Sequence, residues 1–237
     1  MGIRLIMIFF VLLSCMPLAA EEHKAKIGIS LPLTGDGSTY GQDAKNIFIF
    51  ANEKLADNKY ELVFQDDKCS GREAVNAASY FVHVAQIKYV LGLPCSGALL
   101  SAAPLYEKSQ TAVISVGASA PSVSQAGEWI FRTWPSDSGS ARLLAQYVGQ
   151  RHAVLGVLSE ETDYAQALSQ ALEKETAGTG LKLVKEPYVS GTSDFRSILL
   201  KINSLQADGL VIITQAEGPA VLLVKQLREL QWDLPLY

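Results

Sequence analysis

Lys88–Pro121, KYVLGLPCSGALLSAAPLYEKSQTAVISVGASAP, contains two short apolar runs that each end in a loop of small and hydroxyl-bearing residues. The runs are Tyr89–Leu93 and Ala112–Ser115, and the loops are Pro94–Gly97 and Val116–Ser119. A helical pattern lies between the runs, which predicts two strands joined by a helix. Ligands of open α/β sheets bind outside the carboxyl ends of the strands. The loops therefore predict a site for a small carboxylate, bound by free backbone N–H groups, and they contain no obvious catalytic group.

The same alternation of strands and helices continues through most of the chain. Further strands are predicted at Lys26–Leu33, Tyr60–Phe64, Trp129–Arg132, Ala153–Leu158, Leu181–Tyr188 and Gly209–Thr214. Helices are predicted at Gln42–Leu55, from Ser70 as N-cap through Val82, and at Gly97–Lys108, Ser140–Val148, Tyr164–Thr176, Asp194–Leu205 and Pro219–Leu230. Such alternation predicts parallel sheets with helices on both faces, which is an α/β fold.

A break in this alternation predicts two lobes. Thr133–Ser138 (TWPSDS) separates two runs of strands and helices and predicts a crossover between them, with a cleft and a hinge. We expect a first lobe at residues 21–137 and a second at 138–237. The last residues, Gln231–Tyr237, resemble the lead into another strand. The second lobe is therefore expected to be incomplete, with an unpaired sheet edge and exposed apolar helix faces, as in a fragment or truncated product of a longer protein.

The N-terminus has the pattern of a secretory signal peptide. Arg4 precedes an apolar segment, Leu5–Leu13, which is short for a membrane span of about 20 residues. We expect cleavage after Ala20 and a periplasmic location. One alternative is a lipoprotein site in which Cys15 is lipidated, and another is a retained N-terminal anchor helix.

Two cysteines remain after the predicted signal peptide, Cys69 and Cys95. An exported protein folds in an oxidising compartment, so an even pair predicts a disulfide, with two free buried thiols as the alternative. Each cysteine follows a predicted strand. We expect these strands to be adjacent and to bring the two loops side by side.

The composition makes nucleic acid an unexpected partner. The 237 residues carry a formal net charge of −4, and no basic run occurs in the sequence.

The motifs that would indicate a cofactor or a catalytic site are absent or incomplete. Gly35–Gly41 nearly forms a dinucleotide fingerprint, but its third glycine is one residue late. No cluster has the spacing of metal ligands, and no cofactor or catalytic residue is predicted. The carboxylate pairs Asp66–Asp67 and Glu160–Glu161 are expected to be solvated at loop ends.

The motifs together resemble the type I periplasmic solute-binding proteins of the leucine/isoleucine/valine-binding family. The resemblance rests on KIGISLPLTGDGSTYGQDA, FQDDKCSGREAV, the stretch quoted first, FRTWPSD, LSEETDYAQAL, GTSDFRSIL and ADGLVIITQAEGPAVLLVKQLREL. It covers nearly all of the chain after the signal peptide. It implies two Rossmann-like lobes joined by a hinge, no enzymatic activity, and delivery of a small solute to the permease and ATPase of an ABC importer.

The resemblance also implies which residues bind the solute. Ser96 stands where a hydroxyl binds the ligand carboxylate, and Ala118 and Ser119 where a carbonyl and a hydroxyl receive its ammonium and carboxylate. Tyr164 and Tyr40 stand where aromatic side chains cover the ligand, and Cys69 and Cys95 match the family disulfide. Alternatively, Ser96 and Ser119 only cap helices, and Tyr164 is only the first residue of a helix, without contact to a ligand.

The sequence departs from the family pattern in the second lobe. Gln215-Ala216-Glu217 replaces a common aromatic residue, which predicts a smaller and more polar wall, and Glu217 is a candidate for the ligand ammonium. The ligand is expected to be a branched-chain amino acid or a related carboxylate or amide. The alternatives are a ligand sensor of the same fold that feeds a signalling system, and a remnant that no longer binds. An exported hydrolase is disfavoured, because no base lies near Ser96 or Ser119.

Overall fold

The computed structural model describes residues 24–35 and 37–237. The predicted signal peptide, its cleavage after Ala20 and the possible lipidation of Cys15 lie outside these residues. Among the helices of the described part, none is both long and apolar enough to cross a membrane.

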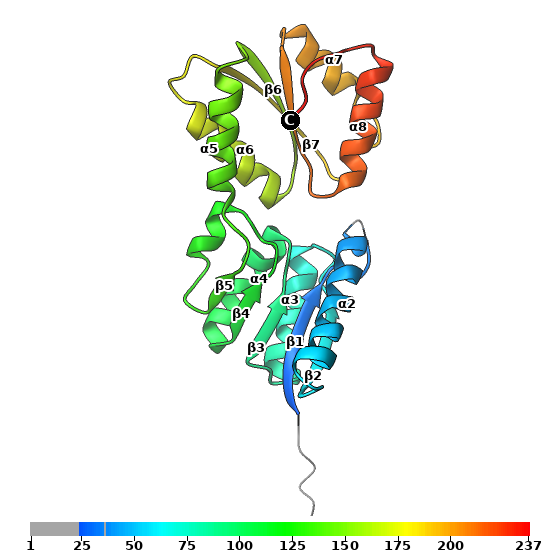
Figure 1. The fold of residues 1–237 in the computed structure, drawn as a ribbon, viewed down its shortest axis with the longest axis vertical. Helices are drawn as coiled ribbons and strands as arrows, with labels where there is room; N and C mark the ends of the chain where they lie inside the picture. The colour runs from blue at the N-terminus through cyan, green and yellow to red at the C-terminus, as the bar shows by residue number, and fades with distance from the viewer. Residues whose placement is uncertain (1–23, 36) are drawn as a thin grey trace, which may run out of the picture.

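Two parallel sheets form the framework of the chain and confirm the predicted α/β fold (Figure 1). The first has the order β2-β1-β3-β4-β5 and the second the order β7-β6-β8. The strands are β1 (Ala25–Leu31), β2 (Tyr60–Asp66), β3 (Tyr89–Gly92), β4 (Ala112–Ser115), β5 (Ile130–Arg132), β6 (Val154–Glu160), β7 (Lys182–Tyr188) and β8 (Gly209–Ile213).

The helices follow the strands in alternation. They are α2 (Ser38–Leu55), α3 (Gly71–Ser79), α4 (Ser96–Ser109), α5 (Asp137–Gly149), α6 (Asp163–Thr176), α7 (Arg196–Ser204) and α8 (Glu217–Glu229), with a 3-10 turn η2 (Pro121–Gln125). We call β1–β5 with α2–α4 the first lobe, and β6–β8 with α5–α8 the second lobe. The chain passes between them after β5, where the break in the pattern predicted a crossover (Figure 1).

The helix predicted from Ser70 through Val82 differs from the structure in two ways. Ser70 occupies the N-cap position of α3, but its side chain makes no capping hydrogen bond. The α-helix ends at Ser79 and continues as a π-helical turn, η1 (Tyr80–Val84). This turn buries Phe81 completely, and its ring packs against Gly28 of β1, where a Cβ would lie 3.1 Å from the ring. The π-helical turn thus contributes Phe81 to the core of the first lobe.

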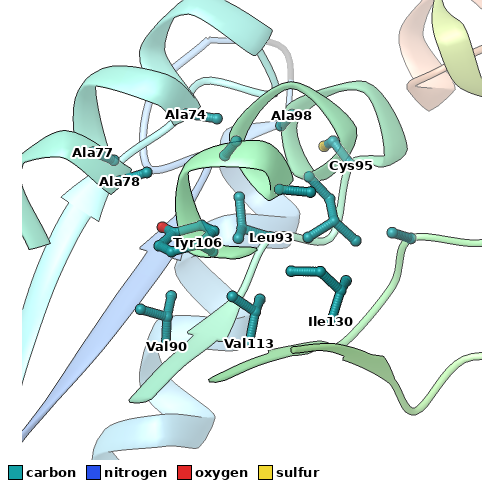
Figure 2. Close-up of a cluster of buried hydrophobic side chains, with 14 of the residues drawn as sticks. Ala74, Ala77, Ala78, Val90, Leu93, Cys95, Ala98, Tyr106, Val113 and Ile130 are labelled. Atoms are coloured by element: carbon teal, nitrogen blue, oxygen red, sulfur yellow. The ribbon is translucent and has the colours of Figure 1, made fainter. Parts of the chain in front are cut away.

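The first lobe is held together by close packing of α3 and α4 on one face of its sheet. Alanines line the facing sides of these helices, including Ala74, Ala78 and Ala98, and they let the helices approach each other and the sheet (Figure 2). Val90 and Val113 extend from the strands below, towards the fully buried Tyr106 (Figure 2). Because this core is densely packed, it fixes the loops that leave β3 and β4.

The opposite face of the first sheet is only partly covered by helices, and some of its apolar side chains are exposed to solvent. Strand register aligns Leu91, Ile114 and Phe131 in one row across β3, β4 and β5. Ile114 is 40% and Phe131 53% exposed, and Ile47 on the neighbouring α2 is 66% exposed. The largest exposed apolar side chains therefore include several in the first lobe, and not only those of the second lobe, where the sequence predicted them.

The second sheet has apolar clusters on both faces. α5 and α6 cover one face, and α7 and α8 cover the other. Leu236 forms a parallel bridge with Leu210 of β8, and Tyr237 exchanges backbone hydrogen bonds with this strand. The last residues therefore pair with the edge of β8.

Candidate ligand-binding site

A cavity of about 290 Å³ lies where the carboxyl ends of both sheets meet. The residues that line it come from loops and helix starts that follow the strands, as the rule for open α/β sheets predicts. They are Pro32, Gly37, Tyr40, Cys69, Pro94, Cys95, Ser96, Gly117, Ser119, Trp134, Tyr164, Thr214 and Gln215. The structure therefore brings four of the six predicted ligand-binding residues together: Ser96, Ser119, Tyr40 and Tyr164.

Ser96 begins α4 at the wall of this cavity. The first intrahelical bond of α4 runs from the N–H of Leu99 to the carbonyl of Cys95, so the N–H groups of residues 96–98 have no acceptor within the helix. The Ser96 hydroxyl accepts a 3.1 Å hydrogen bond from the backbone N–H of Ala120 and keeps its own proton to donate. These donors and the helix dipole together favour an anionic group.

The loop after β4 forms the adjoining part of the wall. Ser115 holds it, because its hydroxyl donates to the carbonyl of Leu93 at 2.8 Å and accepts from the N–H of Ala118 at 3.2 Å. Ser119 is 7% exposed and lines the cavity, whereas Ala118 is fully buried and does not. The Ser119 carbonyl accepts from the backbone N–H of Asp137, which ties this loop to the start of the second lobe.

Three aromatic side chains border the cavity. Tyr40 on α2 is 53% exposed, and its hydroxyl reaches the loop after β4, where a Cβ on Gly117 would lie 3.0 Å away. Tyr164 on α6 is half-buried; burial, followed by the charge of Asp137, raises the pKa of its hydroxyl. Trp134 comes from the crossover. Trp134 was not among the site residues predicted from the sequence, although an aromatic residue in the segment between two lobes was a signal for it.

Cys69 and Cys95 form a disulfide beside the cavity, as predicted, with their Cα atoms 5.3 Å apart. The expected topology was wrong, however. β2 and β3 are not adjacent, because β1 lies between them. The two loops still meet because both fold over the carboxyl end of β1.

A buried carboxylate supports the first-lobe wall, contrary to the expectation for Asp66–Asp67. Asp67 is fully buried; it accepts from the Ser30 hydroxyl at 2.9 Å and from the N–H of Cys69 at 3.0 Å. Burial raises its pKa to about 6, although the two hydrogen bonds act in the opposite direction. For Asp66, burial also raises the pKa, but hydrogen bonds from Thr34 and from the backbone outweigh it, and the pKa lies below its ordinary value.

A second buried carboxylate supports the opposite wall. Glu160, at the end of β6, is 5% exposed, whereas Glu161 is exposed as expected. One Glu160 oxygen accepts from the Ser190 hydroxyl and the other from the backbone N–H of Gln215, each at 2.6 Å. The prediction of solvation failed because these partners lie 30 and 55 residues away in sequence and become neighbours only in the fold.

Glu217 does not line the cavity that contains Ser96. It lines a neighbouring chamber of about 360 Å³, whose walls include Thr39, Ala216 and Val221. Four residues belong to the walls of both spaces: Gly37, Tyr40, Thr214 and Gln215. We call the first space the inner chamber and the second the outer chamber.

The lobes also touch beside the cleft. α6 of the second lobe contacts α4 and η2 of the first. At the start of both helices Gly97 faces Asp163, and a Cβ on Gly97 would lie only 2.6 Å from the Asp163 carboxylate. Glycine at this position therefore permits the observed approach of the lobes.

Among the described residues, no group of three or more His, Cys, Asp or Glu side chains is placed to hold a metal ion. The site thus consists of hydroxyls, backbone N–H groups and aromatic rings on the first lobe, facing an aromatic ring and a polar loop on the second. Such groups bind and orient a small solute.

Comparison with known proteins gives relatives of one kind. The sequence model of a family described as "Periplasmic binding protein" matches residues 24–236. The leucine-, isoleucine-, valine-, threonine- and alanine-binding protein of Pseudomonas aeruginosa is 27% identical over 189 residues, which are 75% of this chain and 50% of that protein. The chain spans about half the length of the curated relatives it matches.

Solved structures agree with this comparison. A leucine-binding protein from Thermotoga maritima is 25% identical and superposes with a TM-score of 0.82, covering 90% of this chain and 62% of that one. A solute-binding protein of an ABC transporter from Rhodopseudomonas palustris, solved with 3,4-dihydroxybenzoic acid, is 18% identical with a TM-score of 0.76. It covers 87% of this chain and 58% of that one, and it has the same fold.

Proposed function

Since this chain belongs to the periplasmic binding protein family, we propose that it acts as the solute-binding subunit of an ABC importer. The family consists of solute-binding proteins of transporters and not of enzymes, in agreement with the sequence analysis. The observation that carries the proposal is that Ser96, Ser119, Tyr40 and Tyr164, from separate elements of two lobes, line one cavity.

The first lobe binds the carboxylate of the solute. The free N–H groups at the start of α4 and the hydroxyls of Ser96 and Ser119 replace the water that the carboxylate loses, which is required because an unpaired buried charge is costly. No Lys, Arg or His lines either chamber among the described residues, so these donors are the groups available to the anion there.

The rest of the solute lies against the aromatic rings and the second-lobe loop. Tyr40, Trp134 and Tyr164 offer apolar surface, and Thr214 and Gln215 offer polar groups. A branched-chain amino acid or a related small carboxylate or amide has this combination of groups. The similar proteins from Pseudomonas and Thermotoga support this choice, because both are named as binding proteins for leucine. The carbonyl of Ala118 reaches the ligand only if its loop moves, because the residue is fully buried here.

Binding brings the lobes together as hinged domains, and the closed form is recognised by a membrane permease with its ATPase. The predicted signal peptide exports the chain to the periplasm, where the solute is met. Gly97 and Asp163 are then part of the surface along which the two lobes close.

Thermal melting with and without single ligands tests this proposal. A ligand that binds only the folded state raises the melting temperature, and at 100 times its Kd it stabilises by about 2.7 kcal/mol. We expect an increase with one class of amino acids, small amides or aromatic acids, and a clearly smaller increase at the same ligand concentration in a Ser96→Ala variant. A cooperative transition that none of these ligands shifts contradicts the proposal.

A further inference from the structure

The inner and outer chambers adjoin at Tyr40 and Gln215. These two residues, with Gly37 and Thr214, form walls of both spaces. The outer chamber, about 360 Å³, is no smaller than the inner one, about 290 Å³. A solute held by its carboxylate at the start of α4 therefore has room to extend past these residues when it is long enough.

The outer chamber differs from the α4 end because it contains a carboxylate, which offsets the positive N-terminal end of α8. Glu217 is its acidic residue, and no basic residue lines it. Among the described residues, the Glu217 side chain forms neither an ion pair nor a hydrogen bond. Glu229 of the same helix, in contrast, forms an ion pair with Arg196. A second carboxylate placed there would be repelled, and an ammonium group would be attracted.

Two further features favour an ammonium group at this end. The Thr39 hydroxyl lines the same space and can accept a hydrogen bond from it. The ring of Tyr40, half-exposed between the chambers, can contact a cation through its face. Glu160, buried behind the backbone of Gln215, adds negative charge on the second-lobe side of the cleft.

We propose that the preferred solute is elongated, with a carboxylate bound at the start of α4 and a terminal primary amine beside Glu217. Its class is an ω-amino carboxylate or a diamino acid, with a flexible chain that passes Tyr40 and Gln215. This inference rests on the proposed function, because it requires carboxylate binding in the inner chamber. It assigns to Glu217 the distal amine and not the α-ammonium of a short amino acid.

Isothermal titration of the full chain with three probes tests the inference: leucine, hexanoate and 6-aminohexanoate. Hexanoate has the length but not the amine, so its comparison with 6-aminohexanoate isolates the distal group. The variants are Glu217→Gln and, as a matched control with the same loss of charge, Glu175→Gln, an exposed residue of α6. Ser96→Ala reports on the carboxylate end.

We expect 6-aminohexanoate to bind more tightly than hexanoate, and Glu217→Gln to weaken 6-aminohexanoate alone by about fivefold, the upper range of a solvent-accessible ion pair. Glu175→Gln should change none of the affinities, and Ser96→Ala should weaken all three probes. The inference is overturned if Glu217→Gln binds 6-aminohexanoate as tightly as the unmodified chain does. If the unmodified chain also binds leucine in a separate titration, the proposed function remains intact. Failure of 6-aminohexanoate to bind the unmodified chain also overturns the inference, whereas the proposed function is contradicted only when no ligand of the melting panel binds either.

Discussion

The buried carboxylate of Glu160 accepts a 2.6 Å hydrogen bond from the backbone N–H of Gln215 and so connects the end of β6 to the cleft loop after β8. Asp67 has the same role in the first lobe, where it connects the end of β2 to Ser30 and to the loop of Cys69. Each cleft wall therefore rests on a carboxylate that is shielded from solvent. Both carboxylates hold backbone that lines the site.

Replacing Glu160 by glutamine should destabilise the protein. Both carboxylate oxygens accept hydrogen bonds, and the amide of glutamine offers one acceptor and one donor group. The amide oxygen can accept from the N–H of Gln215 while the amide NH2 group donates to the Ser190 hydroxyl, but both hydrogen bonds then lose the charge of the carboxylate. We expect a loss of about 1.5–3 kcal/mol in the free energy of unfolding, measured with urea. Glu161→Gln, one residue along and exposed, is the control, and an equal effect of both changes would contradict the role of Glu160.

A methyl group at Gly97 should hinder the approach of the lobes. The Cβ of Gly97→Ala would lie 2.6 Å from the Asp163 carboxylate, so the lobes or this side chain must shift. We expect a larger radius of gyration in small-angle scattering and weaker ligand binding. Asp163→Ala in the same chain should restore both. Gly139→Ala, where a Cβ meets nothing within 4 Å, is the control. The idea fails if Gly97→Ala and Gly139→Ala give the same scattering.

Reduction of the Cys69–Cys95 disulfide should lower stability. The bond joins residues 26 apart, and closing a loop of this size stabilises by roughly 3 kcal/mol relative to the open unfolded chain. Chemical unfolding with and without a reductant measures this difference. In the Cys69→Ser, Cys95→Ser double variant the reductant should have no effect. Identical curves for the oxidised and reduced native chain would show that the bond does not constrain the fold.

The buried carboxyl of Asp67 should give stability a definite pH dependence. Its pKa rises from 3.8 to about 6 on folding, so between these values the folded chain binds more protons than the unfolded one. The contribution of Asp67 to the free energy of unfolding is therefore present below pH 3.8 and is lost as the pH rises through about 6. Asp67→Asn should remove this decrease in melting temperature between about pH 4 and pH 6.

Asp66 provides a control of opposite sign for this titration. Its pKa is lowered on folding, so its stabilising contribution is present above 3.8 and is lost as the pH falls below that value. Asp66→Asn should therefore leave the decrease between about pH 4 and pH 6 in place. If Asp67→Asn and Asp66→Asn give the same pH profile, the buried carboxyl is not its source.

Much of the fold could be predicted because it is encoded in local patterns. The apolar run at Ala112–Ser115 has the bounds of β4, and the break at Thr133–Ser138 lies where the chain leaves the first sheet. Contacts between distant segments could not be derived in this way. Strand order placed β1 between the two cysteine loops, and the burial of Asp67 and Glu160 depends on partners brought by other strands.

The candidate site was predictable to a similar extent. Hydroxyl residues after β3 and β4 identified Ser96 and Ser119 as residues near one cavity, because parallel strands end on the same side of a sheet. The division of the cleft into two chambers, with Glu217 in the outer one, depends on how the second lobe faces the first. Sequence spacing carries no information about that arrangement.

The most direct test of a carboxylate-binding cleft is the affinity of the best ligand, measured by isothermal titration, in Ser96→Ala and in Ser101→Ala. Both residues belong to α4, but only Ser96 lines the cavity. We predict that Ser96→Ala weakens binding about tenfold, the effect of one hydrogen bond to a charged group, and that Ser101→Ala binds like the unmodified chain. Equal affinity in the two variants would contradict the claim that the solute is bound at the start of α4.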